Sequence, residues 1–160
     1  MSYQSRHFKR GFTLTELLIA ISIIAIMSTT TIVGINDFLP YWRLSGGTKQ
    51  LMGSISETQG YSVSEQAIHK ITLTVNSGNY QIIKESDSGD QVVKSIDLPP
   101  TVKVSSLSAN ITNDVIKFNF FGAPLDSLNQ PLGAAQITLT NNRDRTMTVE
   151  VTPAGNVKAY

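Results

Sequence analysis

A run of nineteen residues without a charged side chain, Leu17 to Ile35, constrains the fold of this chain most. The run consists mainly of Ile, Leu and Ala, with some Ser and Thr, whose hydroxyls can bond back to helix carbonyls. Its length is close to the ~20 residues that a helix needs to cross a bilayer core. We therefore predict a transmembrane helix over residues 12–35.

The charges beside this run predict its orientation. Arg6, Lys9 and Arg10 lie before Gly11, on the N-terminal side of the run, and no acidic residue lies before Gly11. Because basic residues favour the cytoplasmic side, we expect a cytoplasmic N-terminus, with everything after about Asn36 across the membrane.

The residues Lys9-Arg10-Gly11-Phe12-Thr13-Leu14-Thr15-Glu16 join the basic segment to the run. An ordinary secretory signal is cut after its apolar run, where Ala25 and Ser28-Thr29 match a cleavage site poorly. An uncleaved membrane anchor would not require this arrangement. Gly11 instead offers an unobstructed cleavage site before the run, because glycine has no side chain and its backbone extends freely.

This motif resembles the leader of type IV prepilins and type II secretion pseudopilins. The resemblance implies that a prepilin peptidase cleaves after Gly11, at the Gly11–Phe12 bond, and methylates the new Phe12 amine. Glu16 would pair with the Phe12 amine of a neighbouring subunit and so set the register of assembly. A carboxylate inside a membrane costs about 2.5–3.5 kcal/mol at the centre, so a partner is expected.

Residues 36–66 carry apolar side chains at partly helical spacing, which predicts an amphipathic continuation of the helix. We expect Pro40 to kink or interrupt this helix, since proline removes a backbone hydrogen bond. Gly46-Gly47 is a second weak point. Tyr41 and Trp42 suit either an aromatic belt at the membrane surface or packing on the globular domain, and both interpretations stay open.

Residues 67–160 change to a period of two, which predicts short β-strands separated by turns. Turn sequences include Ser77-Gly78-Asn79 and Asn141-Asn142, and residues 125–133 are predicted to form a loop. The fold class is therefore α+β: a long N-terminal helix, half transmembrane and half amphipathic, packed on an antiparallel β-sheet or small β-sandwich head. The apolar positions expected in strands are Ile71, Leu73, Val75, Tyr80, Ile82, Ile83, Val92, Val93, Val102, Val104, Ile116, Phe118, Phe120, Ile137, Leu139, Met147, Val149, Val151 and Val157.

A long helix is followed by strands, and the last part of the chain, Arg145 to Val157, includes Pro153-Ala154-Gly155. This arrangement is similar to that of the GspH/FimT group of minor pilins and pseudopilins. Absence of cysteine distinguishes the chain from major pilins with a disulfide-bounded loop. Some members of the group bind DNA through a C-terminal Gly-Arg-x-Arg motif, but here the matching place reads Gly155-Asn156-Val157-Lys158. Arg143, Arg145 and Lys158 are the possible DNA contacts, and a solvated turn is the alternative.

Other functions have little sequence support. Loss of the three basic leader residues leaves ten basic against twelve acidic residues, a net charge of −2 that attracts no nucleic acid. The two histidines, His7 and His69, suggest no catalytic arrangement, so we expect neither an enzyme nor a cofactor. Asp87, Ser88 and Asp90 could offer oxygens to calcium, but they match no EF-hand loop and a solvated hairpin turn is preferred; no metal site is predicted.

The sequence thus predicts four parts: a leader (1–11), a transmembrane and filament-core helix (12–35), its amphipathic continuation (36–66) and a β-rich head (67–160). The predicted function is that of a minor pilin or pseudopilin that assembles into or primes a filament. The alternative is a competence-associated minor pilin whose head binds DNA. Expected partners are the prepilin peptidase, other pilins or pseudopilins, the inner-membrane assembly platform and the inner membrane. We expect the head in the periplasm, and the assembled subunit in a periplasmic or surface filament.

Overall fold

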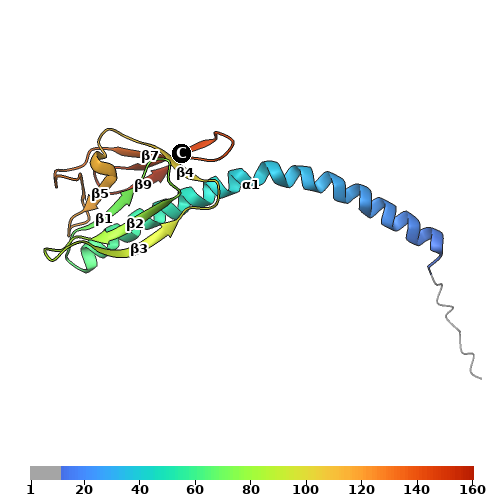
Figure 1. Ribbon diagram of the computed structural model, residues 1–160, viewed down its shortest axis with the longest axis horizontal. Coiled ribbons are helices and arrows are strands. Elements are labelled where there is room, and N and C mark those ends of the chain that lie inside the picture. The colour runs from blue at the N-terminus through green and yellow to red at the C-terminus, as the bar shows by residue number, and fades with distance from the viewer. Residues whose placement is uncertain (1–11) are drawn as a thin grey trace, which may run out of the picture. The chain divides into compact units, whose positions relative to one another are not determined.

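A computed structural model describes residues 12–160, with the side chains of residues 29–37 outside the description. The chain divides into two compact units, Met1–Phe38 and Leu39–Tyr160. In the first unit, the described residues form the beginning of a single helix, α1, which runs from Leu14 to Ser64 (Figure 1). No helix within the described residues combines the length and the apolarity that a membrane crossing requires.

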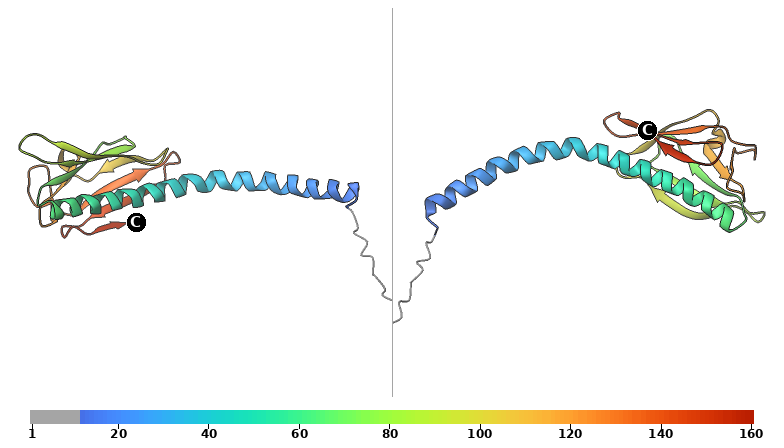
Figure 2. Two further views of the ribbon diagram at one scale, coloured as in Figure 1. Left: turned by 90° about the horizontal axis from the view of Figure 1, so that it is seen from below. Right: turned by 180° about the vertical axis from the view of Figure 1, so that it is seen from behind.

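The second unit, hereafter the head, contains the last part of α1 and two antiparallel sheets. The strands gather around this part of the helix in every view (Figures 1 and 2). The five-stranded sheet has the order β3-β2-β1-β5-β6, and the four-stranded sheet has the order β4-β7-β8-β9. A short 3₁₀ turn, η1 (Thr112–Asp114), precedes β5. The strands are β1 (His69–Leu73), β2 (Asn79–Lys84), β3 (Gln91–Asp97), β4 (Lys103–Leu107), β5 (Val115–Phe118), β6 (Pro124–Leu125), β7 (Ala135–Thr140), β8 (Thr146–Val151) and β9 (Val157–Ala159). The predicted α+β class and the β-rich head are confirmed.

The helix packs on the sheets through a stripe in which apolar and small hydroxyl residues alternate. Leu44, Leu51 and Ile55 are buried, and so are four hydroxyl residues that face the sheets: Thr48, Ser54, Thr58 and Ser62. The hydroxyls of Thr48 and Thr58 donate to the carbonyls four residues earlier, at 2.8 and 2.7 Å. These bonds satisfy the two threonine hydroxyls within the helix itself. The other two hydroxyls also bond to the five-stranded sheet: Ser54 Oγ lies 2.8 Å from the Tyr80 hydroxyl, and Ser62 Oγ accepts a hydrogen bond from the His69 amide at 3.2 Å.

The helix is not interrupted at Pro40, so the expected interruption is wrong, whereas the expected kink stays a prediction. Proline removes only one hydrogen bond of the ladder, and Pro40 is buried against the head, where its carbonyl accepts a hydrogen bond from Asn141 Nδ2 at 3.1 Å. Gly47 is likewise no break. A Cβ at this position would lie 3.1 Å from Pro99 Cδ, so the absent side chain lets the helix approach the β3–β4 connection.

Three predicted strand positions lie outside the strands. Val75 follows β1, Val102 directly precedes β4, and Phe120 lies in the turn after β5. The side-chain oxygen of Asn119 accepts hydrogen bonds from the amides of Phe121 and Ala123, at 3.0 and 2.9 Å, and so closes this turn before Phe120 can extend the strand. The predicted loop over residues 125–133 is correct except at its first residue, which pairs in β6.

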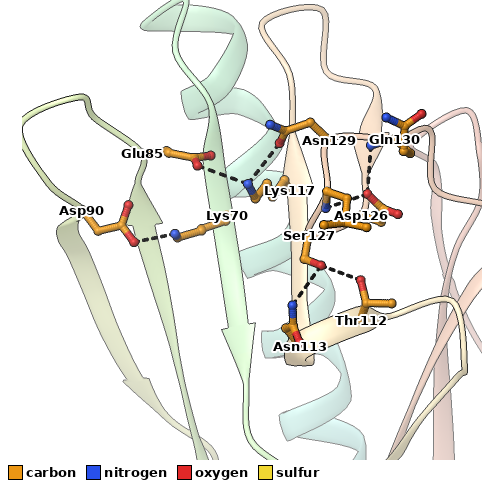
Figure 3. A network of polar contacts seen from close by, with 11 residues as sticks. Lys70, Glu85, Asp90, Thr112, Asn113, Lys117, Asp126, Ser127, Asn129 and Gln130 are labelled. Carbon is orange, nitrogen blue, oxygen red and sulfur yellow. Dashed lines mark hydrogen bonds and ion pairs between the residues drawn. The ribbon is translucent and has the colours of Figure 1, made fainter.

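Lys117 is buried even though the alternation of β5 places it on the outer side of the sheet. The turn after β6 covers it: Asn129 Oδ1 accepts a hydrogen bond from Lys117 Nζ at 3.0 Å, and Glu85 Oε1 accepts another at 3.1 Å (Figure 3). Asp126 shapes this turn by accepting hydrogen bonds from the amides of Leu128 and Gln130. Around Lys117, the outer face of the five-stranded sheet is thus covered by a polar network.

Candidate functional site

The candidate site is the N-terminal end of α1, where the sequence places cleavage, methylation and assembly. Gly11 and the leader lie outside the described residues. Phe12 is the first described residue, and 86% of its side chain is exposed. The helix begins two residues later, at Leu14. Cleavage after Gly11 would therefore leave the whole of α1 on the mature chain.

Thr13 and Glu16 form a capping box at this end. The amide and the hydroxyl of Thr13 both donate to Glu16 Oε2 at 2.9 Å, and the amide of Glu16 donates to Thr13 Oγ1 at 3.2 Å. The arrangement satisfies amides of the first helical turn that have no partner within the helix. Sequence analysis missed this role of Thr13, although the Thr-x-x-Glu spacing before an apolar run is its usual signal.

The capping box turns the Glu16 carboxylate toward the start of the helix. There the carboxylate lies at the positive pole of the helix dipole and beside the backbone that leads to Phe12. Oε2 takes both bonds from Thr13, while Oε1 has no hydrogen-bond partner among the residues that the structure describes. The arrangement can accept an ammonium group from outside the chain without dismantling the cap.

The three possible DNA contacts do not form one cluster. Arg145 lies in the turn before β8, whereas Lys158 lies in β9 opposite Glu150. Arg145 and Glu150 are five positions apart in the chain, a distance of about 17 Å along a strand. Arg143 shares the turn with Arg145 and is engaged with other protein groups. The structure therefore places two arginines at one end of the head and the lysine well away from them.

The turn that was weighed as a calcium site uses its carboxylate internally. Asp90 is paired with Lys70 of β1 (Figure 3). Within residues 12–160, no group of three or more His, Cys, Asp or Glu side chains is arranged to hold a metal ion.

The aromatic residues at the start of the head part of α1 point into solvent. Trp42 is 68% and Tyr41 is 43% exposed. The expectation that they pack on the globular domain is therefore wrong for Trp42, and the aromatic-belt interpretation stays a prediction.

Comparisons with known proteins give a match for the N-terminal segment and another for the fold. Residues 6–32 match the prokaryotic N-terminal methylation motif. The type IV minor pilin FimU of Pseudomonas aeruginosa has a similar structure, with a TM-score of 0.60 and 14% sequence identity over 77% of this chain and 92% of that one. The chain has a minor-pilin fold.

The minor pseudopilin EpsH of the Vibrio cholerae type 2 secretion system is similar as well. It gives a TM-score of 0.58 and 7% identity over 74% of this chain and 96% of that one. No curated protein sequence matches significantly. The predicted resemblance to pilin-like proteins of the GspH/FimT type is thus confirmed by a methylation motif in front and a minor-pilin fold behind it.

Proposed function

We propose that this protein is a structural subunit of the minor pilin or pseudopilin type, without enzymatic activity, that assembles into or primes a type IV pilus or a type II secretion pseudopilus. One observation carries the proposal: a prepilin-type methylation motif at residues 6–32 leads directly into the long helix of a minor-pilin fold. A leader that is removed before its apolar run serves a protein whose helix must remain attached to the head.

The proposed processing joins two steps at one bond. A prepilin peptidase cleaves after Gly11 and methylates the amine of Phe12. The exposure of Phe12 and the helix start at Leu14 support this, because the residue on the C-terminal side of the bond precedes the helix and is open to solvent. Proteolytic cleavage favours such segments.

Glu16 is the proposed assembly residue. Its carboxylate is held by Thr13 at the helix start, where the Phe12 amine of a neighbouring subunit can reach the remaining oxygen. In a low-dielectric filament core, an unpaired carboxylate would be costly, so the pair favours one axial register between adjacent helices.

The proposed location follows from charge. The run from Leu17 to Ile35 has no charged residue, and the basic residues precede it. We propose that residues 12–35 cross the inner membrane with the N-terminus cytoplasmic and the head periplasmic. From there the inner-membrane assembly platform would move the subunit into the filament.

Processing and assembly can be tested separately in a host that carries a pilus or secretion system. Substitution of Gly11 by valine should block cleavage, so the chain should keep the mass of its leader. Glu16→Ala should be cleaved normally but should enter sheared filaments poorly. Asp87→Asn removes a carboxylate from an exposed loop of the head and serves as the matched control. A mature mass in Gly11→Val would contradict the cleavage site, and normal incorporation of Glu16→Ala would contradict the assembly role.

DNA binding by the head is not proposed. Neither the methylation motif nor the similarity to FimU and EpsH supports it, and Lys158 lies apart from the two arginines.

A further inference from the structure

The end of the head where α1 enters carries a concentration of exposed apolar surface. Leu39, Tyr41 and Trp42 follow one another on the helix, and each side chain is more than two-fifths exposed. Tyr and Trp combine an apolar ring with a polar tip, which suits them to a boundary between water and an apolar phase. This group of three residues is called the aromatic collar below.

The β7–β8 turn is fixed at the same level of the helix. Asn141 is buried, and its Nδ2 donates to the carbonyl of Pro40 at 3.1 Å. Its Oδ1 accepts hydrogen bonds from the amides of Arg143 and Arg145 at 2.9 and 3.2 Å. One asparagine thus ties the arginine-bearing turn to the helix directly beside the collar.

This end of the head is basic. Arg43 lies next to Trp42, Lys103 lies opposite Thr140 at the end of β7, and Arg145 is exposed in the turn. Asp144 is the acidic residue of this turn. By contrast, the five ion pairs found among the described residues all involve acids beyond residue 56, at the other end of the helix or in the loops beside it: Glu57, Glu65, Glu85 and Asp90. Arg43 and Arg145 take part in none of these ion pairs.

The position in the chain brings this surface close to a membrane. Trp42 follows Ile35, the last residue of the charge-free run, by seven residues, which is about 10 Å along a helix. The headgroup region of a bilayer is roughly 5–8 Å thick on each side. A helix that leaves a membrane meets the headgroups on all its sides, so the collar and the turn can contact them together even though Pro40 and Trp42 lie on opposite sides of the helix.

We propose that the aromatic collar and the β7–β8 turn form a membrane-docking surface for anionic phospholipid headgroups, on which the head rests before the subunit enters a filament. This inference rests on the proposed membrane insertion of residues 12–35. The aromatic rings enter the headgroup layer, while Arg43, Arg145 and Lys103 contact lipid phosphates. Asn141 keeps the turn at headgroup level by its bond to the helix.

The same cations could contact DNA phosphates, but the observations favour lipid. Exposed Trp, Tyr and Leu side chains next to the cations match an interface with an apolar side. A duplex would require cations along a longer surface, and Lys158 is about 17 Å from the level of the turn.

The chain contains its own probe for this contact, because Trp42 is its single tryptophan. The full-length protein is reconstituted into vesicles of zwitterionic phospholipid, with or without anionic phospholipid. Anionic lipid should shift Trp42 emission to shorter wavelength and increase its quenching by lipids that carry a quencher near the headgroup. Because each basic residue near an anionic surface strengthens binding about fivefold, Arg145→Glu should reduce the docked population more than tenfold. Added salt should act in the same direction as this substitution.

Lys158→Glu is the control, because it makes the same charge change on β9, away from the proposed surface. It should leave the Trp42 emission the same as in the wild type. Co-flotation of each variant with the vesicles reports helix insertion independently, so failure of membrane insertion is distinguishable from failure of docking. Equal emission in both kinds of vesicle, or equal effects of Arg145→Glu and Lys158→Glu, would overturn the proposal. Short duplex DNA is added to the zwitterionic vesicles in a parallel arm. An Arg145-dependent shift with DNA but not with anionic lipid would replace the lipid proposal by DNA binding.

Discussion

The buried ion pair of Lys117 makes a sharp stability prediction. Lys117 is 8% exposed, whereas its partner Glu85 is 34% exposed. Glu85→Ala would leave the buried ammonium with only its bond to Asn129. Removal of one partner of a fully buried pair costs about 3–5 kcal/mol. Here a surface cavity of about 540 Å³, lined by Glu85 and Asn129 among others, lets water approach. We therefore expect a loss of about 2–3 kcal/mol, a decrease in Tm of roughly 6–12 °C.

Substitution of the other partner, Lys117, should reduce stability much less. Lys117→Met removes the buried charge and keeps most of the side-chain volume, while Glu85 can turn toward solvent. We expect a cost of about 1 kcal/mol or less. The double variant should resemble Lys117→Met, because the stranded ammonium is then absent.

The fragment Leu39–Tyr160 suits this measurement, since the head is a compact unit with its own core. Urea unfolding should be followed by far-ultraviolet circular dichroism, because exposed Trp42 reports poorly on the core. The reasoning is refuted if Glu85→Ala lies within about 0.5 kcal/mol of the wild type, which is the usual range of surface substitutions. Equal costs for the two single variants would refute it as well.

Two further predictions concern the same fragment. Gly155→Ala should cost about 2–3 kcal/mol, because Gly155 has φ of +81° and a Cβ would lie 2.5 Å from Gln59 Nε2. Gly53→Ala is its control; a Cβ there meets nothing within 4 Å, and the helix should gain about 0.5–1 kcal/mol. Urea unfolding tests both, and a Gly155→Ala midpoint equal to that of the wild type would contradict the clash. Burial of Tyr80 raises the pKa of its phenol, while the bond to Ser54 at 2.8 Å opposes this shift. The unfolded chain therefore loses this proton first as the pH passes about 10, and the stabilisation present below that pH is lost as the pH rises through the folded pKa. Tyr80→Phe should lose about 1 kcal/mol at neutral pH, but its stability should decrease less above pH ~10; parallel alkaline profiles of the two proteins would exclude this explanation.

Much of the secondary structure of the head could be predicted from local pattern. Period-two apolar residues and turn sequences located β1, β2 and β5, because both signals act between residues close in the chain. Phe120 was assigned to a strand because hydropathy does not register the two hydrogen bonds by which Asn119 closes its turn.

The buried face of α1 was harder to predict. Thr48, Thr58 and Ser62 are as buried as their apolar neighbours, but their hydroxyls count as polar in any hydropathy pattern. Their burial depends on hydrogen bonds back to the helix, which only coordinates show. The burial of Lys117 could not be predicted for a related reason, because its two partners, Asn129 and Glu85, come from a turn and a loop outside β5 that the alternation of this strand does not register.

At the N-terminal site, the sequence by itself determined Gly11, Phe12 and Glu16 as candidates, because their roles depend on residue type and on spacing within a few residues. Thr13 could have been added on the same grounds. The partition of nine strands into two sheets and the bond of Asn141 to Pro40, 101 residues earlier, were decided only by the tertiary structure. Such contacts are selected by the packing of the whole core, in which many distant residues must be buried and hydrogen-bonded together, and no local pattern contains that condition.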